Sequence, residues 1–522
     1  MTEIADPSHP SLEIIQNFKG KYPKQLWYLF FSEMWERFCF YGMRGMLIYF
    51  MVTELLMKQD TANLQYGATQ AFVYAFTFIG GLFADKILGF RRSLFWGGIL
   101  MIIGSGILAY DPHQFFFLGI SFTIVGTGFF KPNISTMVGS LYKANDSRRD
   151  AGFSLFYSGI NIGALIGGYA CITIGKEYSW HLAFGLAGIV MTISLLTFLF
   201  TQKSLGPIGL APANGSLVKP ILTESIGSTA PTQAAIISER PHNKNWHTYA
   251  VYIGSIAVIP VIMIMVAQTR YTDWFMYIIG PATLIYLFYE MRKYNSAERK
   301  KLFAALFFII FSIFFWAFFE QSGGSLSLFA AYNLDNKLLG SVAVDPNGVN
   351  NAANSLFVII FAPLLGLIWV AMDKKRIEPN TIIKFGLGFL FLAGAFYIFY
   401  TTRFFASSQG IASLDVFTLA YLVITFGELC LSPIGLSAMT KLAPAKLQGV
   451  MMGMWFLASA YGQYAAGIIG AGISQGDEND SVFQKLITYT DGYKQLAVYA
   501  LIAGVLMIAV SPLIKKLMGD IK

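Results

Sequence analysis

Charged side chains are scarce in this sequence: Asp, Glu, Lys and Arg make up only 13% of its 522 residues. A soluble globular protein carries about 25%. Hydrophobic residues reach 55% and gather in many long runs, which predicts a polytopic helical membrane protein. The formal net charge of +8 does not indicate nucleic-acid binding, because Lys and Arg fall in short loops between the apolar runs, where they set membrane topology.

Cysteine and histidine are also few. The three cysteines, Cys39, Cys171 and Cys430, lie in apolar stretches without metal-ligand or disulfide spacing. We therefore expect their side chains to be buried and to pack as small apolar groups. The five histidines fall at loops or at the ends of runs, and no nucleophile–base set is visible. An integral membrane enzyme or sensor is therefore an alternative without a motif in its favour. The polar N-terminal segment lacks the apolar core of a signal peptide, so we expect no cleavable signal.

Apolar runs long enough to cross a bilayer recur along the whole chain. We place fourteen of them near 26–52, 64–84, 93–110, 115–138, 152–174, 181–201, 247–268, 272–290, 302–331, 351–372, 381–401, 414–438, 447–473 and 494–514. This pattern predicts an all-α chain with a six-helix bundle over 1–201, a linker over 202–246, two extra helices over 247–290 and a second six-helix bundle over 291–522. Two halves of six helices are typical of a duplicated transporter.

Basic residues concentrate in every second loop. Examples are Lys19, Lys21 and Lys24 before the first run, Lys86, Arg91 and Arg92 after the second, and Lys143, Arg148 and Arg149 after the fourth. The intervening loops carry few basic residues. By the positive-inside rule, both termini are expected to be cytoplasmic.

The first apolar run contains four ionisable residues: Glu33, Glu36, Arg37 and Arg44. Each such group costs about 2.5–3.5 kcal/mol at the centre of a membrane helix unless it is paired. Glu33 and Arg37 have i, i+4 spacing, so these groups can form a polar stripe on one helix face. An intramembrane stripe of this kind indicates a proton or substrate pathway.

The remaining deep charges are Lys131, Glu320 and Glu428. They fall in the fourth run of the first half and in the first and fourth runs of the second half, the helices expected to line a central site in a duplicated transporter. We expect kinks at Pro132 and Pro433, which make the same helices candidate gates. The alternative is that these charges form ion pairs that only brace the bundle.

Several motifs resemble the proton-dependent oligopeptide transporters, the POT family. Three of its signatures are matched in order by Glu33-x-x-Glu36-Arg37-Phe-x-x-Tyr41-Gly, Gly80-Gly81-x-x-Ala84-Asp85-x-x-x-Gly89 and Phe156-Tyr157-x-x-Ile160-Asn161-x-Gly163-Ala164. Two more matches are Phe130-Lys131-Pro132-Asn133 and Gly427-Glu428-x-x-Leu431-Ser432-Pro433. The resemblance covers the whole bundle. It implies a major facilitator fold that imports di- and tripeptides with protons by alternating access. The two extra helices and the short loop at 403–413 resemble bacterial members, so we expect the inner membrane.

The resemblance also implies residue roles. The proton-coupling group would be Glu33, Glu36 and Arg37, and which glutamate takes the proton stays open because such close groups titrate together. Lys131 would hold the peptide carboxylate and Glu428 its amine. The gate would use Arg44, Lys131 and Glu320, with Pro132 and Pro433. The other pocket residues would be Arg37, Tyr41, Tyr74, Tyr157, Asn161, Asn354, Trp455 and Ser459.

The resemblance implies that the protein uses no cofactor and that protons are its coupling ion. Its surroundings would be membrane lipid, and we expect it to bind neither nucleic acid nor an obligate protein partner. One departure is Gly67, where some family members have a histidine. Coupling would then depend on the carboxylates. Two alternatives of the same fold remain: a transporter of nitrate or another anion, and a drug-extruding antiporter.

Overall fold

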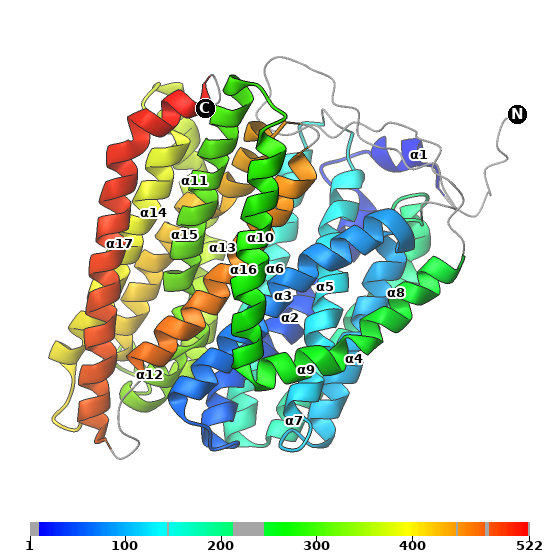
Figure 1. Cartoon of the computed structure of the whole chain (residues 1–522). Coiled ribbons are helices and arrows are strands. Elements are labelled where there is room, and N and C mark those ends of the chain that lie inside the picture. Colours follow the sequence, from blue (N-terminus) through cyan, green and yellow to red (C-terminus); the bar gives the residue numbers. More distant parts are fainter. Residues whose placement is uncertain (1–9, 144–145, 212–244, 445–446, 475–479, 520–522) are drawn as a thin grey trace, which may run out of the picture. The chain divides into compact units, whose positions relative to one another are not determined.

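The computed structural model describes residues 10–143, 146–211, 245–444, 447–474 and 480–519 (Figure 1). Each apolar run predicted from the sequence is helical in it. Within these residues, ten helices are long and apolar enough to cross a membrane. The all-α membrane fold is thereby confirmed, while the count of fourteen spans stays a prediction. Other predicted spans contain the helices Lys24–Thr53, Phe116–Ser140, Thr269–Met291 and Gln448–Ile473.

The chain divides into two compact units. The first contains residues 1–43, 72–167 and 174–264, and the second contains residues 44–71, 168–173 and 265–522. The second unit therefore includes the C-terminal part of the first long helix, α2, and the N-terminal part of the next, α3. The domain boundaries predicted above follow chain order instead, and they stay a prediction.

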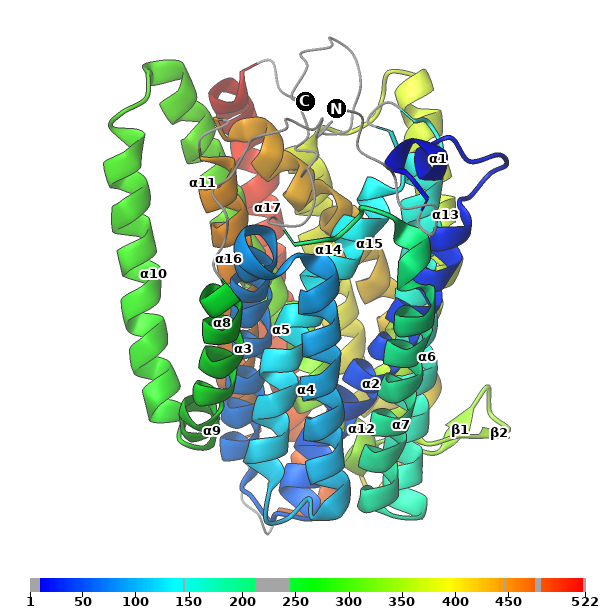
Figure 2. The ribbon, with the colours of Figure 1, turned by 90° about the vertical axis from the view of Figure 1, so that its right-hand side faces the viewer.

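The first unit is built around long helices with close backbone contacts. Its elements include α1 (Leu12–Gln16), α2 (Lys24–Thr53), α3 (Gln59–Phe83), the π-helix η1 (Ala84–Leu88), α4 (Phe90–Tyr110), α5 (Phe116–Ser140), α6 (Arg149–Glu177), α7 (Trp180–Thr201), η2 (Gln202–Leu205), α8 (Asn245–Ala257) and α9 (Ile259–Ala267). Figure 2 shows α4 beside α5. A Cβ atom on Gly126 of α5 would lie 2.7 Å from the carbonyl oxygen of Gly97 on α4. Small residues at such a crossing let membrane helices approach closely.

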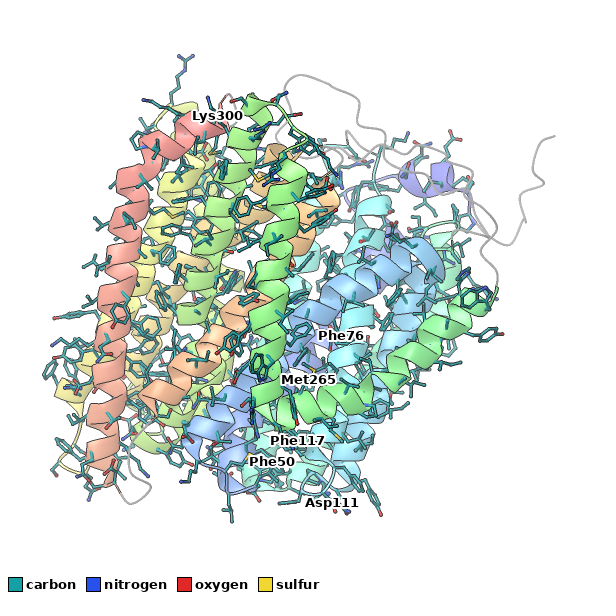
Figure 3. All side chains as sticks on the ribbon, viewed as in Figure 1. Phe50, Phe76, Asp111, Phe117, Met265 and Lys300 are labelled. Atoms are coloured by element: carbon teal, nitrogen blue, oxygen red, sulfur yellow. The ribbon has the colours of Figure 1, made fainter. Side chains whose placement is uncertain are left out.

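The turn between α4 and α5 is held by one carboxylate. Asp111 follows the last residue of α4, and its Oδ1 accepts from the backbone N–H groups of His113 and Gln114, both at 3.0 Å. Figure 3 places Asp111 near Phe117, in the first turn of α5. An Asx turn of this kind reverses the chain without further secondary structure.

The second unit has the same helical character. Its elements include α10 (Thr269–Met291), α11 (Ser296–Phe319), the 3₁₀ turn η3 (Glu320–Gly323), α12 (Ser325–Asn333), α13 (Pro346–Lys374), α14 (Thr381–Thr401), η4 (Thr402–Phe405), α15 (Leu414–Leu442), α16 (Gln448–Ile473) and α17 (Val482–Met518). The strands β1 (Lys337–Leu338) and β2 (Val342–Ala343) form a small antiparallel hairpin. Figure 1 shows α14 beside α17.

The glycine motif that begins in α3 ends in a turn at Gly89. Gly89 has φ +77°, which favours glycine, and a Cβ atom there would also lie 2.5 Å from the backbone nitrogen of Ala211. Arg91, two residues on, donates from Nε to the carbonyl oxygen of Ile208 at 2.6 Å. The motif therefore joins the start of α4 to the segment that follows η2.

Arg148, in the connection between α5 and α6, contacts the N-terminal segment. Arg148 donates to both carboxylate oxygens of Asp146, from Nε at 2.9 Å and from Nη2 at 2.7 Å. Its guanidinium carbon also lies 3.8 Å from the ring centre of Phe18. Hydrogen bonding from Arg148 holds the pKa of Asp146 below its ordinary value.

Candidate functional site

Three ionisable side chains of α2 form a buried cluster in the first unit. Arg37 Nε lies 3.2 Å from Oε1 of Glu33, and Arg37 Nη2 donates to Oε1 of Glu36 at 2.6 Å. All three side chains are at most 2% exposed. The pairing predicted from i, i+4 spacing is confirmed, and it offsets much of the cost of burying these charges.

Arg37 does not satisfy the two carboxylates equally. It contacts Glu36 through both Nε and Nη2, whereas Oε2 of Glu33 accepts no hydrogen bond from the described residues. A carboxylate with an unused oxygen in a dry site can take up a proton at lower cost than one held by a bidentate arginine. The close approach of α6 to this cluster depends on Gly163, where a Cβ atom would lie 3.0 Å from Cβ of Arg37.

Lys131 and Tyr74 meet in the same unit. Nζ of Lys131 on α5 lies 4.6 Å from the ring centre of Tyr74 on α3, a distance at which a cation is attracted to an aromatic face. The sequence placed both residues in a pocket but did not predict this contact. Pro132 lies inside α5, as expected, and the helix continues on both sides of it.

The other predicted pocket residues of the first unit are spread over two helices. Tyr41 on α2 is half-buried, and its ring lies 5.3 Å from that of Phe40. On α6, Tyr157 is 38% exposed, while Asn161 is buried and donates to the carbonyl oxygen of Tyr157 at 3.0 Å. One donor of the Asn161 amide is thus engaged by its own helix.

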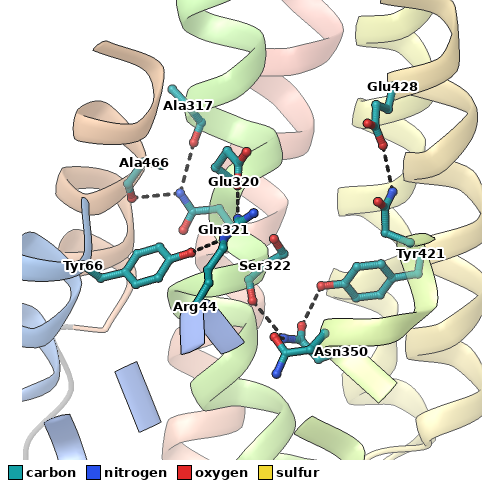
Figure 4. A network of polar contacts seen from close by, with 12 residues as sticks. Arg44, Tyr66, Ala317, Glu320, Gln321, Ser322, Asn350, Tyr421, Glu428 and Ala466 are labelled. Atoms are coloured by element: carbon teal, nitrogen blue, oxygen red, sulfur yellow. Dashed lines mark hydrogen bonds and ion pairs between the residues drawn. The ribbon is translucent and has the colours of Figure 1, made fainter. Parts of the chain in front are cut away.

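The second unit contains the ion pair between Arg44 and Glu320. Arg44 Nε also donates to the hydroxyl of Tyr66 on α3 at 2.7 Å (Figure 4). The sequence predicted Glu320 within one span over 302–331. The structure has one candidate span, Ser296–Asn333, and within it α11 ends at the 3₁₀ turn η3, which begins with Glu320. Of the two basic gate residues implied by the resemblance, Arg44 is the one that pairs with Glu320 in this unit.

Glu428 on α15 is held by a neighbouring amide. Asn354 on α13 donates from Nδ2 to Oε2 of Glu428 at 2.9 Å and to the hydroxyl of Thr425 at 3.1 Å. The structure therefore places two predicted binding residues in direct contact. On α16, Trp455 is buried, and Ser459 donates to the carbonyl oxygen of Trp455 at 3.3 Å. Pro433 falls within α15, but its side chain is outside those that the structure describes.

Sequence reasoning missed three polar residues of the second unit. They are Tyr66, the partner of Arg44, and the pair Asn350 and Tyr421, whose side chains bond to each other at 2.6 Å. Two adjacent asparagines, Asn350 and Asn351, at the start of the span predicted over 351–372 were a signal that could have been followed. The three cysteines are buried, as expected.

Buried, paired charges in membrane-spanning helices are typical of ion-coupled transporters. Among the described residues, no group of three or more His, Cys, Asp or Glu side chains could hold a metal ion. The family model described as the POT family matches residues 91–486. The chain belongs to the POT family and is a transporter, not an enzyme.

Relatives match along most of the chain. "Peptide transporter YePEPT" of Yersinia enterocolitica subsp. palearctica is 35% identical over 86% of this chain and 88% of its own length. "Di-/tripeptide transporter" of Lactococcus lactis subsp. cremoris is 34% identical over 96% of this chain and 97% of its own. A crystal structure of a mutant peptide transporter POT in complex with alafosfalin superposes with a TM-score of 0.80 and 31% identity, covering 98% of this chain and 100% of that one.

Proposed function

We propose that this transporter imports di- and tripeptides together with protons across the bacterial inner membrane, with both termini cytoplasmic. The observation that carries the proposal is the buried Glu33–Arg37–Glu36 cluster in a chain of the POT family. Relatives described as peptide transporters support the substrate class. Protons are the coupling ion in this proposal, and it needs no other cofactor.

The proposed cycle assigns one step to each group. An external proton binds the Glu33/Glu36 stripe, Lys131 holds the peptide carboxylate and Glu428 its amine. The Arg44–Glu320 pair closes the outer gate. Loss of the proton to the cytoplasm restores pairing with Arg37 and opens the inner side. A zwitterion needs both a cation and an anion, which supports a peptide over a simple anion such as nitrate.

Uptake of a labelled dipeptide into proteoliposomes tests the proposal. An inward proton gradient should drive accumulation, and a protonophore should abolish it. Unlabelled dipeptide should compete and nitrate should not. Uptake that does not depend on the proton gradient would contradict the proposal. Accumulation only when the gradient is reversed would contradict it and favour the antiporter.

A further inference from the structure

Three asparagines of α13 contact different parts of the second unit. Asn350 and Asn354 are one helical turn apart, and Asn351 is adjacent to Asn350. Asn354 donates to Glu428, as described above. The other two asparagines lie beside the two members of the Arg44–Glu320 pair, one beside each.

Asn350 holds the turn that carries Glu320. Its Nδ2 donates to the carbonyl oxygen of Ser322 at 2.8 Å, and Ser322 lies two residues after Glu320 in η3 (Figure 4). Its Oδ1 accepts from the hydroxyl of Tyr421 on α15 at 2.6 Å. Tyr421 is 2% exposed and packs 5.7 Å from the ring of Phe399. The Ser322 carbonyl oxygen can only accept, so it fixes which end of the Asn350 amide faces it, because a flipped amide would set two acceptors against each other. The Tyr421 hydroxyl then donates to the amide oxygen that this orientation leaves.

Asn351 holds the backbone beside Arg44. Its Nδ2 donates to the carbonyl oxygen of Gly45 at 3.3 Å. A Cβ atom at Gly45 would lie 2.7 Å from the same nitrogen, so only glycine allows this approach. Residues 44 and 45 belong to the second unit, as does all of α13.

We propose that Asn350 and Asn351 are positioning residues that set the Arg44–Glu320 pair, with Tyr421 holding Asn350 in place through a hydrogen bond to its amide oxygen. The proposal rests on the proposed transport function. Through Asn354, the same helix face reaches the carboxylate assigned to the peptide amine. Asn350 and Asn351 join α13 to the backbone beside each member of the pair, at Ser322 and at Gly45. The hydrogen bonds of Asn350 and Asn351 therefore contribute to how firmly the gate closes.

Tyr421→Phe removes one hydroxyl and leaves the ring in its aromatic packing. We expect kcat for proton-driven dipeptide uptake to fall about tenfold, the effect of losing one buried hydrogen bond, while KM stays within about twofold. Tyr397→Phe on α14 removes the same atom from a 56% exposed ring and should leave kcat unchanged. Asn351→Ala is the second variant and should show the same split of kcat from KM, with a smaller fall.

A double-mutant cycle with Glu320→Gln separates positioning from general support of the fold. If Tyr421 acts through the gate pair, Tyr421→Phe should change dipeptide exchange no further in the Glu320→Gln background. The unfolding temperature reports the support that the Tyr421–Asn350 bond gives to the fold, and it should fall equally in both backgrounds because that bond does not involve Glu320. An additive effect on dipeptide exchange would overturn the positioning role. Absence of dipeptide uptake by the unmodified protein would overturn the proposed function instead.

Discussion

Arg44 and Glu320 form an ion pair although they are 276 positions apart in the chain. The side chain of Arg44 is 13% exposed and that of Glu320 is 4% exposed. A pair so deeply buried differs from a surface salt bridge, because each charge depends on the other to offset the loss of water. The pair therefore identifies where the end of α2 is bound within the second unit.

Removal of one partner should destabilise the protein more than removal of both. Arg44→Met leaves the Glu320 carboxylate uncompensated, which costs about 3–5 kcal/mol, whereas Arg44→Met with Glu320→Leu removes both charges and should recover much of that loss. Thermal unfolding in detergent measures the difference. A double variant less stable than Arg44→Met would contradict this account of the pair.

Glu33→Gln should separate proton coupling from peptide binding. The substitution keeps the shape of the side chain but removes its charge and its capacity to take up a proton, while the two contacts of Arg37 with Glu36 remain. We expect loss of uptake driven by a proton gradient and retention of peptide counterflow in the same proteoliposomes. Equal loss of both activities would show that Glu33 serves binding or folding rather than coupling.

The helices could be predicted because each one needs a long apolar run, whatever its neighbours are. The 3₁₀ turn η3 inside the span Ser296–Asn333 was not predicted, because the apolar run over 302–331 continues past Glu320 and outweighs the turn signal of Gly323 and Gly324. The charges of the stripe were found because i, i+4 spacing lies within one helix. The bond between Asn350 and Tyr421 joins residues 71 positions apart, and its register depends on how α13 packs on α15.

The role of Gly67 also depends on a contact between helices that the sequence does not reveal. The sequence indicates only that a histidine is absent. In the structure, a Cβ atom at this position would lie 2.7 Å from Cα of Gly467 on α16. Any larger residue would therefore separate these two helices, a packing reason that spacing along the chain does not reveal.

Two glycines of α16 provide a matched test of that crossing. A Cβ atom on Gly467 would lie 2.8 Å from both Cα of Gly67 and the carbonyl oxygen of Asn63, whereas one on Gly472 would meet nothing within 4 Å. Gly467→Ala should lower the free energy of unfolding by about 1–3 kcal/mol through overpacking. Gly472→Ala should be neutral or stabilising by up to about 1 kcal/mol. Equal unfolding temperatures for the two variants would contradict the close crossing.

The Asp146–Arg148 contact predicts a pH dependence of stability. Hydrogen bonds from Arg148 depress the pKa of Asp146 in the folded protein from its ordinary value of 3.8. A depressed carboxylate pKa contributes stability that is present above the unfolded pKa and is lost as pH falls through the folded pKa. Asp146→Asn, which cannot ionise, should therefore be less stable than the unmodified protein at pH 7. Below about pH 4 the gap in unfolding temperature should narrow. A gap of constant size down to pH 3 would show that the carboxylate acts through its shape rather than through its charge.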